Sequence, residues 1–293
     1  MTIAPEAPVL SYLSLEITGR CQLTCPSLCY AGSGPLGDHG SMSEQDWLRT
    51  IDEAVSLGTE EIQLIGGEPT LNPAFVRIAR YALDAGLSVR VYTNLVRVRD
   101  EHWQLFRTPG VRLATTYHSA DADEHDRTTG RTGSHKATRG NITKAVELGI
   151  PIRVAILDAG DGDRVERARA DMQALGVTDI HVGEVRAVGN AGPALPSTSE
   201  LCGRCGDRRA TVLPTGDVAV CEIGRFLTAG NVRHDGGLRA VVSSGQWADA
   251  TASVPRRPDV RACSPGDCEP ASSDSCAPSK GNPCGPMGFT PLA

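Results

Sequence analysis

Three cysteines lie close together near the N-terminus, in the run Cys21-Gln-Leu-Thr-Cys25-Pro-Ser-Leu-Cys29. Thiolates from one tight loop can bind three irons of a cubane iron–sulfur cluster and leave the fourth iron free to bind and reduce a small molecule. A zinc site is the alternative, but it needs a fourth nearby ligand, which this loop lacks. The spacing therefore indicates an iron–sulfur cluster that performs one-electron chemistry.

A glycine-rich turn lies further downstream, where Gly66-Gly67-Glu68-Pro69 directly follows the apolar run 61–65. Bare glycine backbone lets a ligand approach closely, and the Glu68 carboxylate can receive an amine. In open α/β folds, ligands bind beyond the carboxyl ends of the strands. A glutamate in a solvated turn would have the same sequence context, so this turn alone is a weak signal.

Taken together and in this order, the two motifs resemble those of the radical S-adenosylmethionine superfamily. The usual family loop is C-x3-C-x2-C followed by an aromatic residue, whereas this chain has one more residue before Cys29 and then Tyr30. The resemblance implies a catalytic [4Fe-4S] cluster and bound S-adenosylmethionine. The implied ligands are Cys21, Cys25 and Cys29 for the cluster, and Gly66, Gly67 and Glu68 for the cofactor amine.

Other residues occupy positions that serve the cofactor in this family. Tyr30 matches the aromatic residue near the adenine, and Thr93-Asn94 ends a predicted strand at the ribose position. Arg131 or Arg186 is a candidate for the cofactor carboxylate, because a guanidinium fork matches a carboxylate bidentately. The alternatives are packing for the tyrosine, strand-end capping for the Thr-Asn pair and solvent exposure for the arginines.

Three histidines, His118, His125 and His135, lie at or after the end of the fourth predicted strand, which should face substrate or cofactor. They could act as acid–base groups, because histidine titrates near neutral pH. A single histidine is more often a hydrogen-bonded structural residue, so both interpretations stay open.

The elements that must position these residues alternate along the chain. Short apolar runs alternate with amphipathic stretches, which is typical of βα units around a parallel sheet. Ser43 followed by Asp46 predicts a capped helix that ends at Gly58, and Asn72-Pro73 predicts the start of a helix that runs to Gly86. The sequence predicts an α/β fold, a partial (β/α)6 TIM-like barrel, which the resemblance also implies. Strands are expected at 13–18, 61–65, 88–93, 112–116, 152–157 and 180–182, and further helices at 138–148 and 164–175.

The character of the chain changes after Gly192, so we expect a barrel domain over 1–192 and a cysteine-rich extension over 193–293. Within the extension, strands are expected at 209–213 and 218–221, and a short helix around Trp247. Its cysteines resemble the opening of SPASM and twitch extensions, which implies an auxiliary [4Fe-4S] cluster, with a structural zinc site as the rival. The expected ligands are Cys202, Cys205, Cys221 and Cys268, and the candidate hydrogen-atom donors are Cys263 and Cys268.

Composition limits the cellular setting and the partners. The chain of 293 residues is 40% hydrophobic and 22% charged, with a formal net charge of −6. It has no basic block that would bind nucleic acid, and neither a signal peptide nor an apolar run long enough to span a membrane. We therefore expect a cytoplasmic protein, in which ten cysteines indicate metal ligands or catalytic thiols before disulfides.

The resemblance implies an enzyme in which a 5′-deoxyadenosyl radical abstracts a hydrogen atom, with electrons from a reductase such as flavodoxin or ferredoxin. The acidic net charge suits a polycationic aminosugar, and no peptide-recognition domain is expected before the first strand. The leading hypothesis is therefore natural-product tailoring, by epimerisation of an aminoglycoside-like small molecule. One alternative is a ribosomal peptide maturase that epimerises, oxidises or cross-links its substrate. Another is a non-catalytic iron–sulfur or zinc-binding scaffold.

Overall fold

The six predicted βα strands pair with one another in a single parallel sheet, and three later strands extend it. The computed structural model describes residues 10–234 and 236–256, in which the sheet has nine strands in the order β6-β5-β4-β3-β2-β1-β7-β8-β9. Strand β7 is parallel to β1, whereas β8 and β9 are antiparallel to their neighbours. The strands are β1 (Tyr12–Glu16), β2 (Glu61–Ile65), β3 (Ser88–Tyr92), β4 (Val111–Thr116), β5 (Ile152–Asp158), β6 (Asp179–Glu184), β7 (Arg209–Val212), β8 (Asp217–Ala219) and β9 (Thr228–Asn231).

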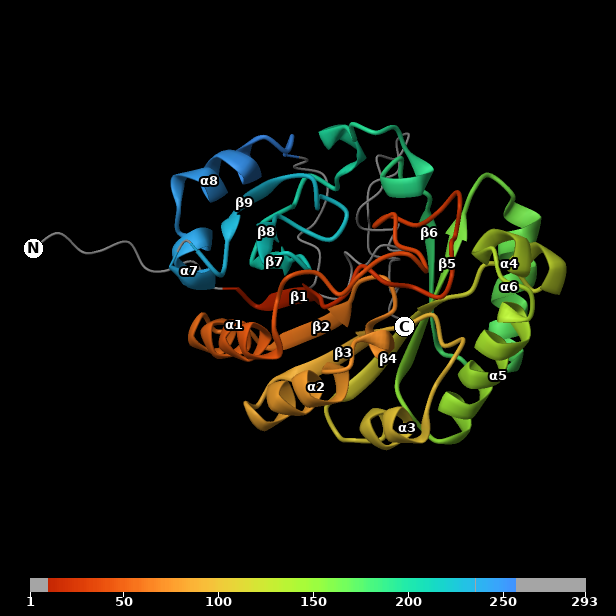
Figure 1. The fold of residues 1–293 in the computed structure, drawn as a ribbon. Coiled ribbons are helices and arrows are strands. Elements are labelled where there is room, and N and C mark those ends of the chain that lie inside the picture. Colours follow the sequence, from red (N-terminus) through yellow and green to blue (C-terminus); the bar gives the residue numbers. More distant parts are fainter. Residues whose placement is uncertain (1–9, 235, 257–293) are drawn as a thin grey trace, which may run out of the picture.

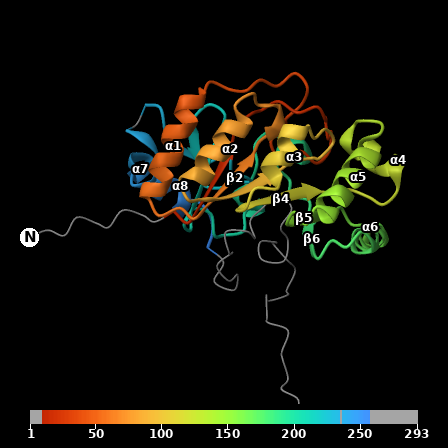
Figure 2. The same cartoon turned by 90° about the horizontal axis from the view of Figure 1, so that it is seen from below.

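A layer of helices covers the outside of the parallel strands. Helices α1, α2 and α3 lie side by side, and α5 and α6 continue the layer toward β6 (Figures 1 and 2). This arrangement is the predicted partial (β/α)6 barrel. The helices are α1 (Glu44–Ser56), α2 (Phe75–Asp84), α3 (Asp100–Phe106), α4 (Ala122–Thr129), α5 (Ser134–Glu147), α6 (Gly162–Ala174), α7 (Gly237–Val242) and α8 (Gly245–Ala252), with short 3-10 turns at Pro69–Leu71, Gly189–Ala191 and Thr198–Glu200.

Local sequence signals explain where some of these helices begin. Ser43 caps α1, since its side chain accepts from the Asp46 N–H while the Asp46 carboxylate accepts from the Ser43 N–H. The predicted capping box is confirmed, and such a cap stabilises a helix by about 1 kcal/mol. Helix α2 begins at Phe75 rather than at Asn72, because Asn72 is extended and its side chain instead accepts from the Ala74 N–H at 2.8 Å.

The sequence does not predict α3, α4 or α7. Helix α4 reads Ala-Asp-Glu-His-Asp-Arg-Thr-Thr, which has no apolar stripe, so helical periodicity cannot reveal it. Its ends are nevertheless well defined, because Asp121 accepts from the Glu124 N–H and Gly130 closes the helix with φ of 69°. Helices α3 and α7 have seven and six residues, which is too short for a clear periodic pattern.

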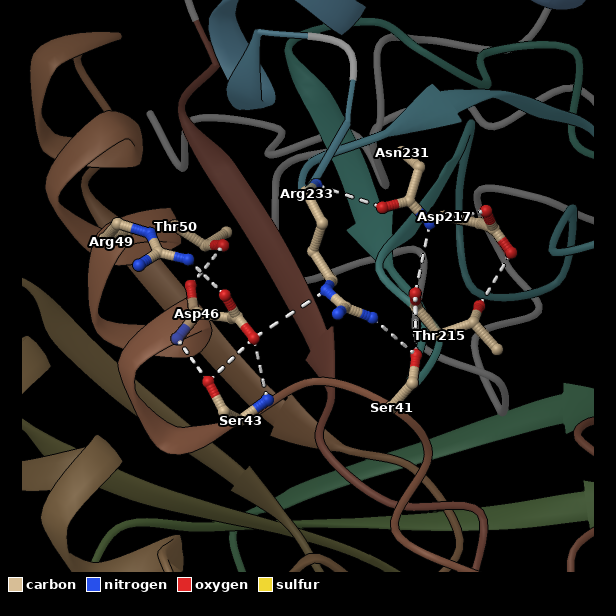
Figure 3. A network of polar contacts seen from close by, with 9 residues as sticks. All are labelled: Ser41, Ser43, Asp46, Arg49, Thr50, Thr215, Asp217, Asn231 and Arg233. Carbon is tan, nitrogen blue, oxygen red and sulfur yellow. Dashed lines mark hydrogen bonds and ion pairs between the residues drawn. The ribbon is translucent and has the colours of Figure 1, made fainter.

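The C-terminal strands are joined to the barrel through β1. Tyr12 pairs with Arg209 and Leu15 with Val212, so the predicted strand pair continues the barrel sheet, and β9 adds a strand that was not predicted. Figure 3 shows a second connection, in which Arg233 donates to Ser41 at 3.1 Å and lies 3.8 Å from the Asp46 carboxylate. The domain boundary near residue 192 stays a prediction.

The two faces of the inner strands differ in polarity. On β1, Leu13 and Leu15 belong to the apolar core under the helices, while the alternate residues Ser14 and Glu16 are buried and polar. The interior of the barrel is thus lined with hydrogen-bonding groups, as a ligand site requires. Within the described ranges, no helix is both long and apolar enough to cross a membrane.

Candidate functional site

A pocket lies at the carboxyl ends of the parallel strands. Its volume is about 850 Å³, part of it open to solvent. Several segments distant in sequence supply its walls, and most of the residues predicted to bind the catalytic cluster and its cofactor meet there. The lining residues are Cys21, Leu23, Cys25, Leu28, Cys29 and Tyr30 from the loop after β1, Ile65, Gly66 and Gly67 from the end of β2 and the turn after it, Tyr92, Thr93 and Asn94 from the end of β3 and beyond, Thr116 and His118 at and after the end of β4, and His125, Thr129, Thr138 and Leu157.

Backbone hydrogen bonds hold the cysteine loop in place. The N–H groups of Thr24 and Cys25 both donate to the Thr129 carbonyl at 3.1 Å, and the Asn190 N–H donates to the Cys29 carbonyl at 2.8 Å. Cys25 has φ of 35°, a left-handed conformation that is unfavourable for a residue with a side chain. The loop is therefore fixed from two sides in a conformation that it would not adopt alone.

Backbone donors approach two of the three loop thiols. The N–H groups of Leu23 and Ser33 approach the sulfurs of Cys21 and Cys29 at 3.4 and 3.3 Å, as donors beside a bound thiolate do. Burial raises the pKa of Cys21 and of Cys25 to about 12, so metal binding has to displace their protons. In the described ranges, no group of three His, Cys, Asp or Glu side chains is already arranged to hold one metal ion. A cubane binds each thiolate through a different iron, and so needs a wider spacing than a single ion does.

The two glycines of the turn are required by the cysteine loop itself. A Cβ on Gly67 would lie 2.3 Å from the Arg20 carbonyl oxygen, and one on Gly66, whose φ is 137°, would lie 2.3 Å from that of Thr18. The Gly67 and Glu68 N–H groups donate to these same carbonyls at 2.8 Å. The sequence predicts that these glycines let a ligand approach. The structure shows that they also let the turn contact the segment before Cys21.

Glu68 lies just outside the pocket lining and connects two strand ends. It is 1% exposed, and one of its oxygens accepts from the Thr70 hydroxyl at 2.7 Å and the Thr93 hydroxyl at 2.8 Å. The other oxygen accepts from the Asn94 N–H at 2.8 Å. Burial raises the pKa of Glu68, although these hydrogen bonds act in the opposite direction. Its expected contact with the cofactor amine stays a prediction, and what the structure shows is that Glu68 positions Thr93 and Asn94.

The remaining predicted cofactor residues divide into two groups. Tyr30, Thr93 and Asn94 line the pocket, and burial raises the pKa of the Tyr30 phenol. Arg131 is exposed and Arg186 donates to the Glu200 carbonyl, and neither lines the pocket. A carboxylate role for either arginine therefore stays a prediction.

Sequence reasoning missed the apolar part of the lining and one structural contact. Leu23 and Leu28 lie between the loop cysteines and Leu157 ends a predicted strand, and only these places in the sequence could have indicated them. The contact between the Thr129 carbonyl and the cysteine loop has no sequence signal.

The C-terminal cysteines form a second buried group. Cys202, Cys205 and Cys221 are all buried, and the sulfurs of Cys205 and Cys221 are 3.4 Å apart. The Gly224 N–H approaches the Cys221 sulfur at 3.1 Å. Sulfurs bound to one tetrahedral zinc, with bonds of about 2.3 Å, lie roughly 3.8 Å apart, which is close to this spacing. A cubane, which binds each thiolate through a different iron, needs these two sulfurs to lie further apart. Cys263 and Cys268 lie outside the described residues.

A buried polar network occupies the barrel interior near both cysteine groups. Arg225, four positions after Cys221 in the sequence, forms an ion pair with Glu16 at 2.9 Å and interacts electrostatically with Cys29. Gln63 donates to Ser14 at 3.0 Å and to Glu222 at 3.3 Å. Burial raises the pKa of Glu16 despite the Arg225 charge.

These features agree with comparisons to known proteins. Residues 15–175 match the radical SAM superfamily, and the chain belongs to that superfamily. It is 30% identical over 180 residues to the sporulation killing factor maturation protein SkfB of Bacillus subtilis, covering 61% of this chain and 43% of SkfB. It is 29% identical over 208 residues to the PqqA peptide cyclase of Ruegeria pomeroyi, covering 67% of this chain and 54% of the cyclase. The chain thus spans about half the length of these curated relatives.

A solved structure shows the same fold. SuiB of Streptococcus suis bound to the precursor peptide SuiA superimposes with a TM-score of 0.68 at 12% identity, over 81% of this chain and 65% of SuiB. At this identity, the likeness supports the fold alone. The superfamily uses a [4Fe-4S] cluster and S-adenosylmethionine, and the pocket has three thiols and a glycine turn suited to them.

Proposed function

We propose that this protein is a radical S-adenosylmethionine enzyme that modifies a peptide. The observation that carries the proposal is the convergence of the three loop cysteines with Gly66, Gly67, Thr93 and Asn94 on one pocket. Cys21, Cys25 and Cys29 would hold the catalytic cluster, and the strand ends would hold the cofactor. When bound, this pair supplies one-electron chemistry that removes a hydrogen atom from unactivated carbon.

The chain contributes binding, orientation and exclusion of water. The Thr93 hydroxyl, whose proton is donated to Glu68, would accept from a sugar diol, and the Asn94 amide would donate to it. Glu68 fixes the positions of both residues. Leu23, Leu28 and Leu157 provide apolar walls that keep water away from a reactive group.

A peptide substrate is better supported than the aminosugar suggested by the net charge. SkfB is named as a maturation protein, the cyclase is named for the PqqA peptide, and SuiB binds a precursor peptide. The lining residues that the structure describes include no Asp or Glu, so that part of the pocket has no carboxylate to bind a polycation. The net charge of −6 is a property of the whole chain and does not report on this pocket.

The second cysteine group supports an auxiliary site. Cys202, Cys205 and Cys221 would bind an auxiliary [4Fe-4S] cluster with Cys268 as the fourth ligand, and this cluster would accept an electron from the substrate. In the alternative outcome, epimerisation, whichever of Cys263 and Cys268 is not a cluster ligand would instead return a hydrogen atom to the substrate radical. Electrons for cleavage of S-adenosylmethionine would come from flavodoxin or ferredoxin.

Anaerobic reconstitution of two triple variants tests the catalytic assignment. Alanine at Cys21, Cys25 and Cys29 should remove about four irons per chain and abolish reductive cleavage of S-adenosylmethionine. The matched control, alanine at the three C-terminal cysteines, should lose the auxiliary metal but retain this cleavage. Cleavage by the first variant would show that the catalytic cluster is elsewhere.

Deuterated candidates test the substrate class. Transfer of deuterium into 5′-deoxyadenosine from deuterated peptides would support the peptide assignment. Transfer from deuterated aminosugars alone would instead support an aminoglycoside-like substrate.

A further inference from the structure

Besides the three cysteines, two histidines contribute polar side chains to the pocket wall. His118 follows β4 and His125 lies on α4, and their ring centroids are 5.3 Å apart with the planes at 70°. His118 is 9% exposed and His125 is 1% exposed, yet both line the pocket. In the part of the chain that the structure describes, the buried Nδ1 atoms of both rings lack a hydrogen-bond partner.

Neighbouring side chains hold these rings in place. The rings of Tyr117 and His135 each lie 5.4 Å from that of His125. The Tyr117 hydroxyl is 2.8 Å from His135 Nε2 and donates to the Asp171 carboxylate at 2.6 Å. Arg164 donates to the His118 carbonyl, which fixes the backbone there. A supported, immobile pair of this kind is what a binding site needs.

The two rings are uncharged at neutral pH. Burial lowers the pKa of His118 to about 3 and that of His125 to about 4, and the nearby Arg164 charge acts in the same direction on His118. A neutral imidazole carries one donor and one acceptor nitrogen, so the Nδ1 of each ring can donate or accept a hydrogen bond according to its tautomer.

We propose that His118 and His125 bind an uncharged planar group that presents a hydrogen-bond donor beside an acceptor. Buried polar atoms in folded proteins nearly always have partners, so the two unpaired nitrogens indicate a ligand that supplies them. A cation is disfavoured by Arg164, and neutral rings hold an anion weakly. A peptide unit of the substrate has the required pair of groups, and so does the adenine edge of the cofactor. The inference rests on the proposed function only in placing substrate and cofactor in this pocket.

Substitution of each histidine by leucine and by asparagine tests the proposal. Leucine removes the polar atoms, whereas asparagine keeps a donor and an acceptor near the Nδ1 position. The asparagine variant therefore separates loss of the hydrogen bond from loss of folding. His234→Leu, at an exposed histidine after β9, is the matched control. Calorimetry on the reconstituted enzyme measures S-adenosylmethionine binding, and ligand-observed NMR on the S-adenosylmethionine-loaded enzyme measures binding of N-acetylalanine methylamide, a blocked peptide unit.

The two possible ligands, adenine and a peptide unit, predict different binding results. If adenine is the ligand, either leucine variant should weaken S-adenosylmethionine binding about tenfold or more, and asparagine should restore most of it. If a peptide unit is the ligand, S-adenosylmethionine binding should persist while the leucine variants lose the blocked alanine signal. The proposal is overturned if the leucine variants bind S-adenosylmethionine as the wild type does and show no loss of the amide probe. Failure of the wild type to cleave S-adenosylmethionine would instead count against the proposed function. The binding measurements would still test the role of the two histidines, because they do not depend on cleavage.

Discussion

Replacing Glu68 by glutamine tests whether this side chain organises the cofactor side of the pocket. One carboxylate oxygen accepts from the Thr70 and Thr93 hydroxyls at 2.7 and 2.8 Å, and the other accepts from the Asn94 N–H at 2.8 Å. A backbone donor faces each carboxylate oxygen, since the Thr70 N–H also donates to the first one at 3.2 Å. In either orientation the NH2 of a glutamine amide therefore faces a backbone N–H, and two donors meet in a buried site.

The expected cost follows from these contacts. Loss of one hydrogen bond to a charged acceptor costs about 1.5–3 kcal/mol. Glutamine also removes a buried charge, whose unfavourable burial is the cause of the raised Glu68 pKa, so part of this cost is offset. We expect a net loss of about 1–3 kcal/mol in unfolding free energy. We also expect a roughly ten- to hundredfold weaker affinity for S-adenosylmethionine, because Asn94 would shift.

Urea unfolding and calorimetry on the reconstituted enzyme measure the two effects, with iron content as a check that the cluster is intact. Glu60→Gln changes an exposed glutamate beside the same strand and serves as the control. Thr93→Val, alone and combined with Glu68→Gln, shows whether the two residues act together, since coupled residues give non-additive losses. Unchanged unfolding free energy and unchanged affinity in Glu68→Gln would refute the reasoning.

Three further predictions follow from other contacts. Gly67→Ala should prevent stable cluster incorporation, measured as iron per chain, because the new Cβ would lie 2.3 Å from the Arg20 carbonyl. Arg225→Met should lower the unfolding free energy by about 3–5 kcal/mol, since it leaves the buried Glu16 carboxylate unpaired, and adding Glu16→Gln should recover much of this loss. The unfolding free energy of the wild type should fall more steeply than that of His118→Asn between pH 6.5 and 5.5. The difference should approach 1.4 kcal/mol per pH unit, because the unfolded imidazole takes up a proton that the native ring, with a pKa of about 3, does not.

Each of these has an outcome that would contradict it. Gly34→Ala, where a Cβ would meet nothing within 4 Å, should retain iron, and equal iron loss in both glycine variants would remove the steric argument. A double variant no more stable than Arg225→Met would mean that the unpaired Glu16 charge is not the cause of the loss. Parallel pH curves for wild type and His118→Asn would show that the ring is not held neutral.

The strands and the cysteine loop could be predicted because their signals are local. The alternating apolar pattern predicts β2 with its observed bounds, Glu61–Ile65. The capping box of Ser43 and Asp46 predicts where α1 begins. The partners of Glu68 could not be predicted in the same way. They depend on the parallel register of β2 with β3, which brings the end of one strand beside Thr93 and Asn94 some twenty-five residues later. The pairing of β7 with β1 likewise joins residues nearly two hundred positions apart, and no local pattern encodes it.

The pairing of β7 with β1 links the two cysteine groups physically. Strand β1 leads directly into the loop with Cys21, and β7 and β8 lead into the turn with Cys221. The interior face of β1 presents Ser14 and Glu16, which bind Glu222 and Arg225 from that turn. Buried polar groups are costly unless every partner is present, so neither half of this network is favourable without the other. The C-terminal strands therefore complete the barrel wall at β1, and the contact between Arg225 and Glu16 joins the turn that carries Cys221 to the strand that leads into the loop with Cys21.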